Sequence, residues 1–136
     1  MTTDTPTTAT GTPVVSAAQQ AAIDAYVAAW NETDAAKRAA LLEDGTGEDL
    51  WYRDPMLEAD SRDAFAAVLG AVQQQLPGHV LTRTSDVDAH HDLVRFNWAL
   101  GVPGEAPTFS GVDIAKFDGD DKLHRIIGFA GESVGA

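Results

Sequence analysis

Apolar residues near the start of the chain recur with the spacing of an α-helix. Ile23, the first of them, is followed on the same face by residues at i+3, i+4 and i+7, which are Tyr26, Val27 and Trp30. Ser16 and Gln19 have the spacing of a capping box, in which the side chain of each residue accepts a hydrogen bond from the backbone N–H of the other. The pattern predicts a helix that begins after Ser16 and buries its apolar face, a phenol included.

Two more helices are predicted further along the chain. Thr33 or Asp34 can cap a short helix that glycine ends at Gly45, and Ser61 opens a longer one that closes at Pro77-Gly78. Apolar side chains line one side of the longer helix: Phe65, Val68, Leu69, Val72 and Leu76.

The remaining segments have the pattern of β-strands. Strands are predicted at 50–54, 79–85, 93–100, 108–117 and 123–129, and turn residues such as Pro103-Gly104 and the run 118–121 stand between the later ones. Helices followed by strands with short connections predict an α+β fold, in which helices cover one face of a largely antiparallel sheet. A doubly wound α/β fold is disfavoured.

A single domain is expected. The chain has 136 residues, which falls in the usual range for one domain with one core. Residues 1–15 are rich in threonine, are interrupted by Pro6, Gly11 and Pro13, and show no periodicity. We therefore expect a disordered tail over 1–15 and one domain over 16–136.

The charge balance is strongly acidic. Nine Lys and Arg residues against 21 Asp and Glu residues give a formal charge of −12, which opposes binding to nucleic acid or to an anionic membrane. There is no cysteine, so a disulfide framework and a thiolate metal site are excluded. No segment has the length of a membrane span or the pattern of a signal peptide, and a cytoplasmic location is expected.

Three titratable side chains stand in apolar surroundings: Tyr26, Asp54 and Asp113. Tyr26 lies on the apolar face of the first helix, and Asp54 ends a strand on the same face as Leu50 and Tyr52. Asp113 lies in the middle of a strand, where aspartate is rare and an ionised carboxylate among apolar neighbours is costly. Ordinary structural roles are the alternatives: a core tyrosine, a turn aspartate before Pro55, and a solvated strand residue.

The histidines suggest a metal site only weakly. His90 and His91 stand beside Asp88 and Asp92, but adjacent residues of an extended segment point to opposite faces, so we expect no metal there. His79 can reach a pocket or cap the end of a helix. No phosphate-binding loop and no nucleophile motif are present, and no cofactor is expected.

Four segments together resemble the superfamily of nuclear-transport-factor-2-like (NTF2-like) proteins. They are the run YVAAWNETD from Tyr26 to Asp34, Arg53-Asp54-Pro55, Gly111-Val112-Asp113, and FDGDDKL over 117–123. The branch they resemble contains ketosteroid isomerases and SnoaL-like polyketide cyclases. The resemblance covers nearly all of 16–132 and implies a cone-shaped curved sheet wrapped around helices, with one apolar pocket for a small hydrophobic organic ligand.

The resemblance also implies roles for the three titratable residues. Tyr26 and Asp113 would hydrogen-bond a substrate carbonyl, and Asp54 would move the proton; in a cyclase, Asp113 alone would be the acid and base. The strand over 93–100 places three side chains where the resemblance puts the pocket wall, although they can equally be plain core. The expected substrate-binding residues are Trp30, Phe96, Trp98, Leu100 and Phe129.

Two function classes follow from these expectations. The first is an enzyme that enolises a carbonyl compound without a cofactor, as an isomerase or a cyclase; an epoxide hydrolase of the same fold would need an arginine in the pocket, and Arg95 is the nearest candidate. The second is a non-catalytic ligand-binding or dimerisation module. A homodimer is expected because Val112, Ile114 and Lys116 give the outer face of the sheet a mixed apolar character.

Overall fold

Three helices pack against one face of a curved sheet in the computed structural model, which describes residues 15–131. The helices are α1 (Ala17–Asn31), α2 (Ala35–Gly45) and α3 (Arg62–Gln75). Each begins where a side chain caps it: Ser16, Asp34 and Ser61 accept a hydrogen bond from the backbone three residues on, so that Asp34 rather than Thr33 caps α2. The capping box of α1 is complete, with both hydrogen bonds at 3.1 Å.

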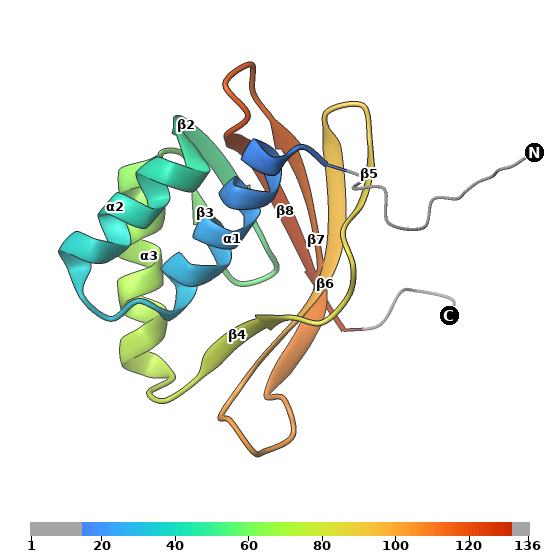
Figure 1. The fold of residues 1–136 in the computed structure, drawn as a ribbon. Helices are drawn as coiled ribbons and strands as arrows, with labels where there is room; N and C mark the ends of the chain where they lie inside the picture. Colours follow the sequence, from blue (N-terminus) through green and yellow to red (C-terminus); the bar gives the residue numbers. More distant parts are fainter. Residues whose placement is uncertain (1–14, 132–136) are drawn as a thin grey trace, which may run out of the picture.

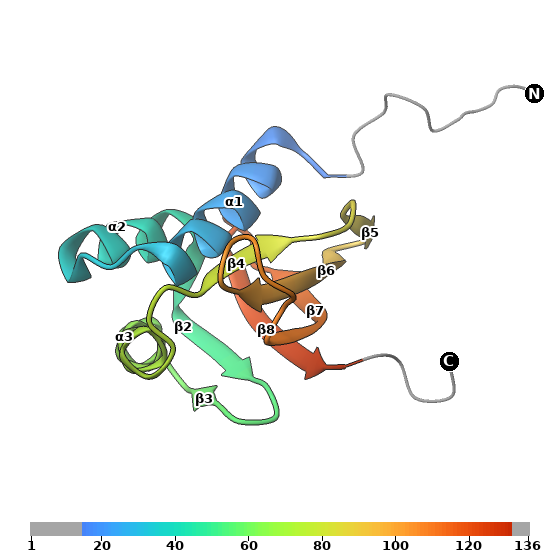
Figure 2. The ribbon, with the colours of Figure 1, turned by 90° about the horizontal axis from the view of Figure 1, so that it is seen from below.

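Seven strands form one mixed sheet. They are β2 (Thr46–Arg53), β3 (Glu58–Ala59), β4 (Val80–Arg83), β5 (Asp88–His90), β6 (Leu93–Gly101), β7 (Phe109–Phe117) and β8 (Leu123–Ala130). Their order is β3-β2-β8-β7-β6-β4, and β5 pairs with β6. All pairs are antiparallel except β2 with β8, which are parallel. The sheet is not closed, and its curvature is plain in the view from below (Figure 2).

The predicted α+β class is therefore confirmed, with differences at short elements. Strands β3 and β5 were not expected. The tail prediction falls on residues 1–14, which lie outside the described part of the chain. Val15, also assigned to the tail, is 8% exposed and belongs to the core.

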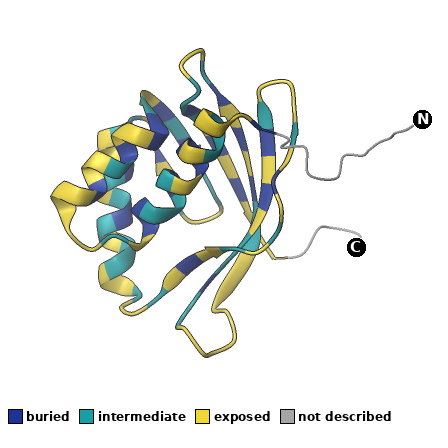
Figure 3. Cartoon of the chain, in the orientation of Figure 1, coloured by how far each residue is buried: buried dark blue, intermediate teal, exposed yellow. Residues whose placement is uncertain are grey.

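The core lies between the helices and the inner face of the sheet, where the dark blue residues of Figure 3 face one another. An aromatic cluster fills its centre: the Phe65 ring lies 4.6 Å from Tyr52 and 6.1 Å from both Tyr26 and Trp30. Each such buried side chain contributes about 1.5–3 kcal/mol relative to an exposed one. The cluster thus fixes two tyrosine rings, one from α1 and one from β2, beside the same phenylalanine.

Within residues 15–131, no helix has both the length and the apolar character needed to cross a membrane.

Candidate functional site

A cavity of about 160 Å³ opens between α1, α3 and the inner face of the sheet. Its walls are almost entirely apolar. The lining residues are Trp30, Tyr52, Asp54, Pro55, Met56, Leu57, Val72, Gln75, Leu76, Leu81, Trp98, Leu100, Phe109, Asp113 and Ala130. Met56 and Phe109 are the exposed large apolar members of this set, at 78% and 37%, and so mark its mouth.

Asp113 occupies the buried part of the cavity wall. It lies in the middle of β7, paired with Phe96 on one side and with Gly128 on the other, and strand alternation turns its side chain inward. Only 3% of the residue is exposed. The Tyr26 hydroxyl donates a hydrogen bond of 2.8 Å to its Oδ2 atom, so residues 87 positions apart in the chain form one buried pair.

The environment raises the pKa of Asp113 from 3.8 to about 7. Burial is the largest cause, because a desolvated carboxylate is less stable than the neutral acid, and the nearby Asp54 adds to the effect. The hydrogen bond from Tyr26 and the Trp98 indole oppose it by stabilising the charged form. The indole N–H makes no hydrogen bond of ordinary geometry, so Tyr26 is the stronger partner.

Asp54 directly follows the last residue of β2. Its carboxylate accepts hydrogen bonds from the next turn and also forms part of the cavity wall. Its Oδ1 atom accepts hydrogen bonds of 2.8 Å from the backbone N–H groups of Met56 and Leu57, and its Oδ2 atom accepts one of 2.6 Å from the Tyr52 hydroxyl. Three donors therefore hold this carboxylate. Its position is fixed before any ligand arrives.

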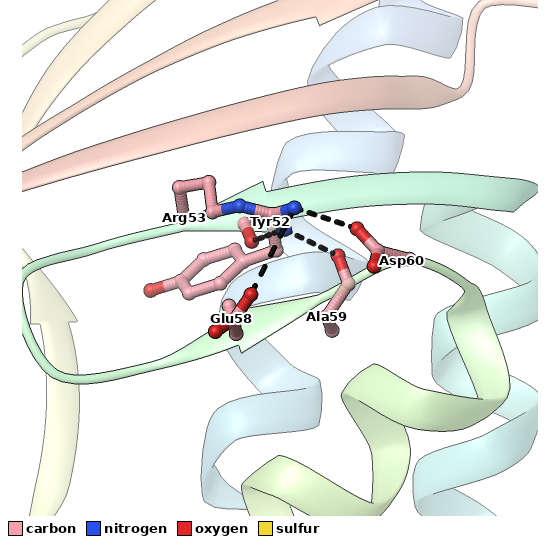
Figure 4. A network of polar contacts seen from close by, with 5 residues as sticks. All are labelled: Tyr52, Arg53, Glu58, Ala59 and Asp60. Atoms are coloured by element: carbon pink, nitrogen blue, oxygen red, sulfur yellow. Dashed lines mark hydrogen bonds and ion pairs between the residues drawn. The ribbon is translucent and has the colours of Figure 1, made fainter.

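A network around Arg53 anchors the same turn from the other side. The guanidinium donates to the carbonyl oxygens of Tyr52 and Ala59 at 2.8 and 3.1 Å, and pairs with Asp60 at 2.7 Å (Figure 4). These contacts join β2 to β3 across the turn that carries Asp54. The guanidinium also lies 4.4 Å from the centre of the Trp51 ring, on the sheet face away from the helices.

Tyr52 was not among the residues predicted for the site. It is 2% exposed, lines the cavity and donates to Asp54. Burial, and then the charge of Asp113, raise the pKa of both Tyr52 and Tyr26 well above 10, so both phenols keep their protons and act as donors. The alternation that puts Asp54 on the inner face of its strand also puts Tyr52 there, and this signal was present in the sequence.

Gly128 allows the two carboxyl groups to approach each other. A Cβ atom at this position would lie 2.9 Å from Asp113 Oδ1 and 3.2 Å from the Cβ of Asp54. It would also lie 3.8 Å from the Tyr52 hydroxyl. The three polar side chains thus meet above a residue that has no side chain of its own.

The predicted site residues divide into two groups. Trp30, Trp98, Leu100, Asp54 and Asp113 line the cavity. Three others do not. Tyr26 is fully buried and reaches the cavity only through Asp113; Phe96, 2% exposed, packs edge-on against the Tyr26 ring; and Phe129, 54% exposed, lies on the outer face of the sheet.

The histidines and Arg95 stand apart from the cavity. His79 contacts Thr108 and the Pro77 carbonyl, and the rings of His90 and His91 contact each other at a turn where His91 has a φ of 54°. Arg95 pairs with Asp88 in solvent. Among residues 15–131, no group of three or more His, Asp or Glu side chains is placed to hold a metal ion, and no arginine lines the cavity.

Comparison with protein-family models gives no match, and no curated protein sequence matches. Solved structures do match. A candidate isomerase of the SnoaL-like family from Agrobacterium tumefaciens is 26% identical, with a TM-score of 0.78, over 86% of this chain and 100% of that one. An NTF2-like protein of unknown function from an Exiguobacterium species has 16% identity and a TM-score of 0.66, over 82% and 99%.

A third structure is a candidate polyketide cyclase from Sinorhizobium meliloti, with 13% identity and a TM-score of 0.62 over 79% of this chain and 92% of that one. A curved sheet around helices is thus shared with NTF2-like proteins. The chain therefore has the NTF2-like fold, and SnoaL-like proteins are among the solved structures that it resembles.

Proposed function

We propose that this protein is an enzyme that enolises a small carbonyl compound without a cofactor, and that Asp113 is the group that moves the proton. The observation that supports this most is a carboxyl group 3% exposed in an apolar cavity, with a pKa of about 7. A general acid or base works best when its pKa lies near the working pH, because both protonation states are then available.

In the proposed reaction, the Asp113 carboxylate removes a proton from the carbon next to the substrate carbonyl. The C–H electron pair forms the carbon–carbon double bond, and the carbonyl π pair moves to oxygen. The Tyr52 hydroxyl faces the cavity and can donate to that enolate oxygen if it gives up its hydrogen bond to Asp54. Asp113 then returns its proton to a different carbon in an isomerisation, or the enolate carbon adds to a second carbonyl in a ring closure and Asp113 gives its proton to the alkoxide oxygen that forms.

Two contacts favour Asp113 over Asp54 as the base. Asp54 already accepts three hydrogen bonds, two of them from a turn that would have to open before both oxygens were free. Tyr26, which an Asp54-centred mechanism would use to bind the substrate oxygen, donates its hydrogen bond to Asp113 and does not line the cavity. Tyr26 is instead a positioning residue that orients Asp113.

The test is deuterium incorporation from D₂O into a panel of enolisable ketones, followed by NMR. Wild-type protein should accelerate exchange, with a rate that rises through a pH of about 7 as Asp113 ionises. Asp113→Asn should lose on the order of 100-fold or more. Asp88→Asn, which changes an exposed aspartate on β5, is the matched control and should exchange like wild type. Exchange that survives in Asp113→Asn and disappears in Asp54→Asn would assign the base to Asp54.

The alternative is a module that binds a ligand or a second copy of itself without catalysis. Its supporting observation is the outer face of the sheet, where Ile114 and Ile127 are each 37% exposed and Phe129 is 54% exposed. Ligand binding in the cavity without exchange of any ketone in the panel would favour this alternative.

A further inference from the structure

The charges around the cavity are unevenly distributed. Its wall contains two carboxyl groups, Asp54 and Asp113, and no lysine, arginine or histidine. The nearest cation along the chain, Arg53, is held by Asp60 and by two carbonyl oxygens beside β3. A carboxylate or phosphate entering the cavity would find no counter-ion and would meet like charge, which is an effective means of rejection.

A cationic ligand is disfavoured for a different reason. An ammonium group must shed its water, and it recovers this cost only if several acceptors surround it. Asp54 already accepts three hydrogen bonds, and Asp113 Oδ2 accepts one from Tyr26. The rest of the wall offers aliphatic and indole carbon, mainly from Leu76, Leu81, Leu100, Trp30 and Trp98.

The volume limits the size of the ligand. A cavity of about 160 Å³ is close to the roughly 150 Å³ apolar cavity that is known to bind benzene in another protein. It is smaller than the pockets of about 300–1,000 Å³ that take drug-sized molecules. One six-membered ring fits this space, whereas fused rings exceed it.

From these three observations we infer that the cavity takes a neutral, monocyclic carbonyl compound and rejects rings of the same size that carry a carboxylate or an ammonium group. The carbonyl group would lie beside Asp113, and the Tyr52 hydroxyl could bind its oxygen by exchanging the hydrogen bond to Asp54 for one to the ligand. The carbonyl part of this inference rests on the proposed function. The size and the neutral charge rest on the cavity alone.

Matched probes can test the size, the charge and the carbonyl group of the ligand separately, because the same six-membered ring can carry different groups. The set is cyclohexanone, cyclohexanecarboxylate, cyclohexylammonium and the fused bicyclic 1-decalone, each titrated into the full chain at pH 6.5. Binding is followed through the indole N–H signals of Trp30 and Trp98, with Trp51, which lies outside the cavity, as an internal reference. Cyclohexanone should shift the first two signals with a Kd on the order of 1 mM, and the other three probes should bind at least about 10-fold more weakly.

A pair of variants on β4 checks that binding occurs in this cavity. Leu81 lines it and is 5% exposed, whereas its neighbour Val80 is 37% exposed and points away. Leu81→Phe should abolish the shifts and Val80→Phe should keep them. If Leu81→Phe does not fold, the four probes on wild-type protein still decide the matter.

Each result bears on one conclusion at a time. Tighter binding of 1-decalone, or of either charged ring, would overturn the inferred ligand class even if Asp113-dependent exchange of some ketone were observed. Binding of cyclohexanone with no exchange in D₂O would support the ligand class while contradicting the proposed reaction.

Discussion

Asp113 links the chemistry of the site to the stability of the fold. Its pKa is about 7 in the folded protein and near 3.8 when exposed to solvent, so between these pH values the folded chain holds a proton that the unfolded chain has released. The folded state is then favoured at low pH, and this contribution is lost as the pH rises through 7. This pKa shift changes the free energy of unfolding by roughly 4 kcal/mol at most, at about 1.36 kcal/mol per pKa unit.

We therefore predict that Asp113→Asn raises the free energy of unfolding above that of wild type at pH 8. At pH 4 the two free energies should lie closer together. The side-chain amide keeps an acceptor for Tyr26 and cannot ionise. Urea unfolding at both pH values measures the effect. Subtracting the unfolding free energy of the variant from that of wild type removes the contribution of the other groups around this carboxyl, including Tyr26, Tyr52 and Asp54. Equal pH dependence of the two proteins would mean that the Asp113 carboxylate is not destabilised by burial.

The two tyrosines should have different effects on Asp113. Tyr26 donates directly to this carboxyl and lowers its pKa, whereas Tyr52 donates to Asp54. Tyr26→Phe should consequently raise the pKa of Asp113 above 7, and Tyr52→Phe should change it less. A ¹³C NMR titration of the carboxyl carbon in both variants gives the answer, and a larger rise in Tyr52→Phe would contradict the assignment of Tyr26 as the orienting residue.

At the scale of whole elements, β8 brings the two acids together because it carries a glycine between them. Gly128→Ala would place a methyl group 2.9 Å from Asp113 Oδ1, so the carboxyl must move. We predict a loss of ketone exchange on the order of 10-fold or more, with the fold retained. Gly47→Ala on β2 is the control, since its methyl would meet only the side-chain oxygens of Asp49 and Asp118, at 3.1–3.3 Å. If both variants exchange like wild type, the spacing of the two acids is not critical.

The elements also show what could be predicted from sequence. Helix starts were predicted to within one residue, because Ser16, Asp34 and Ser61 act on the adjacent backbone and need no distant partner. Strands β3 and β5 are two and three residues long and exist only through their pairing with β2 and β6, which no local pattern encodes.

Phe129 shows how a local irregularity defeats the counting of alternate residues. Alternation from the buried Leu123 would turn Phe129 inward. Leu123 and Arg125 instead pair with the adjacent residues Phe117 and Lys116, so β8 carries one extra residue there. The count shifts by one, Ile126 and Gly128 face the core, and Phe129 faces solvent. For the Tyr26–Asp113 pair, the sequence pattern predicted that both residues are buried. Their hydrogen bond could not be predicted, because it depends on the packing of α1 on β7.

At the scale of the whole molecule, the helices cover one face of the sheet and leave the other bare within the described chain (Figure 1). The bare face carries an apolar centre of Val112, Ile114, Ile127 and Phe129, in which Ile114 pairs with Ile127 and Val112 with Phe129. Around it lie four of the nine cations of a chain whose net charge is −12: Arg125, and Arg53, Arg95 and Lys116, which are each paired with a carboxylate. This face therefore has charges of both signs and an apolar centre that a second copy could cover.

We accordingly predict a homodimer in which the bare faces of two copies meet about a two-fold axis. Light scattering after size-exclusion chromatography should give twice the 14.4 kDa mass of one chain. Ile127→Glu should give monomers, because it buries two unpaired carboxylates in a symmetric interface. Ala39→Glu adds the same charge to the exposed side of α2 and should leave the dimer intact. A wild-type monomer at all concentrations would contradict the prediction, whereas loss of the dimer in both variants would place the contact elsewhere or make it depend on net charge alone.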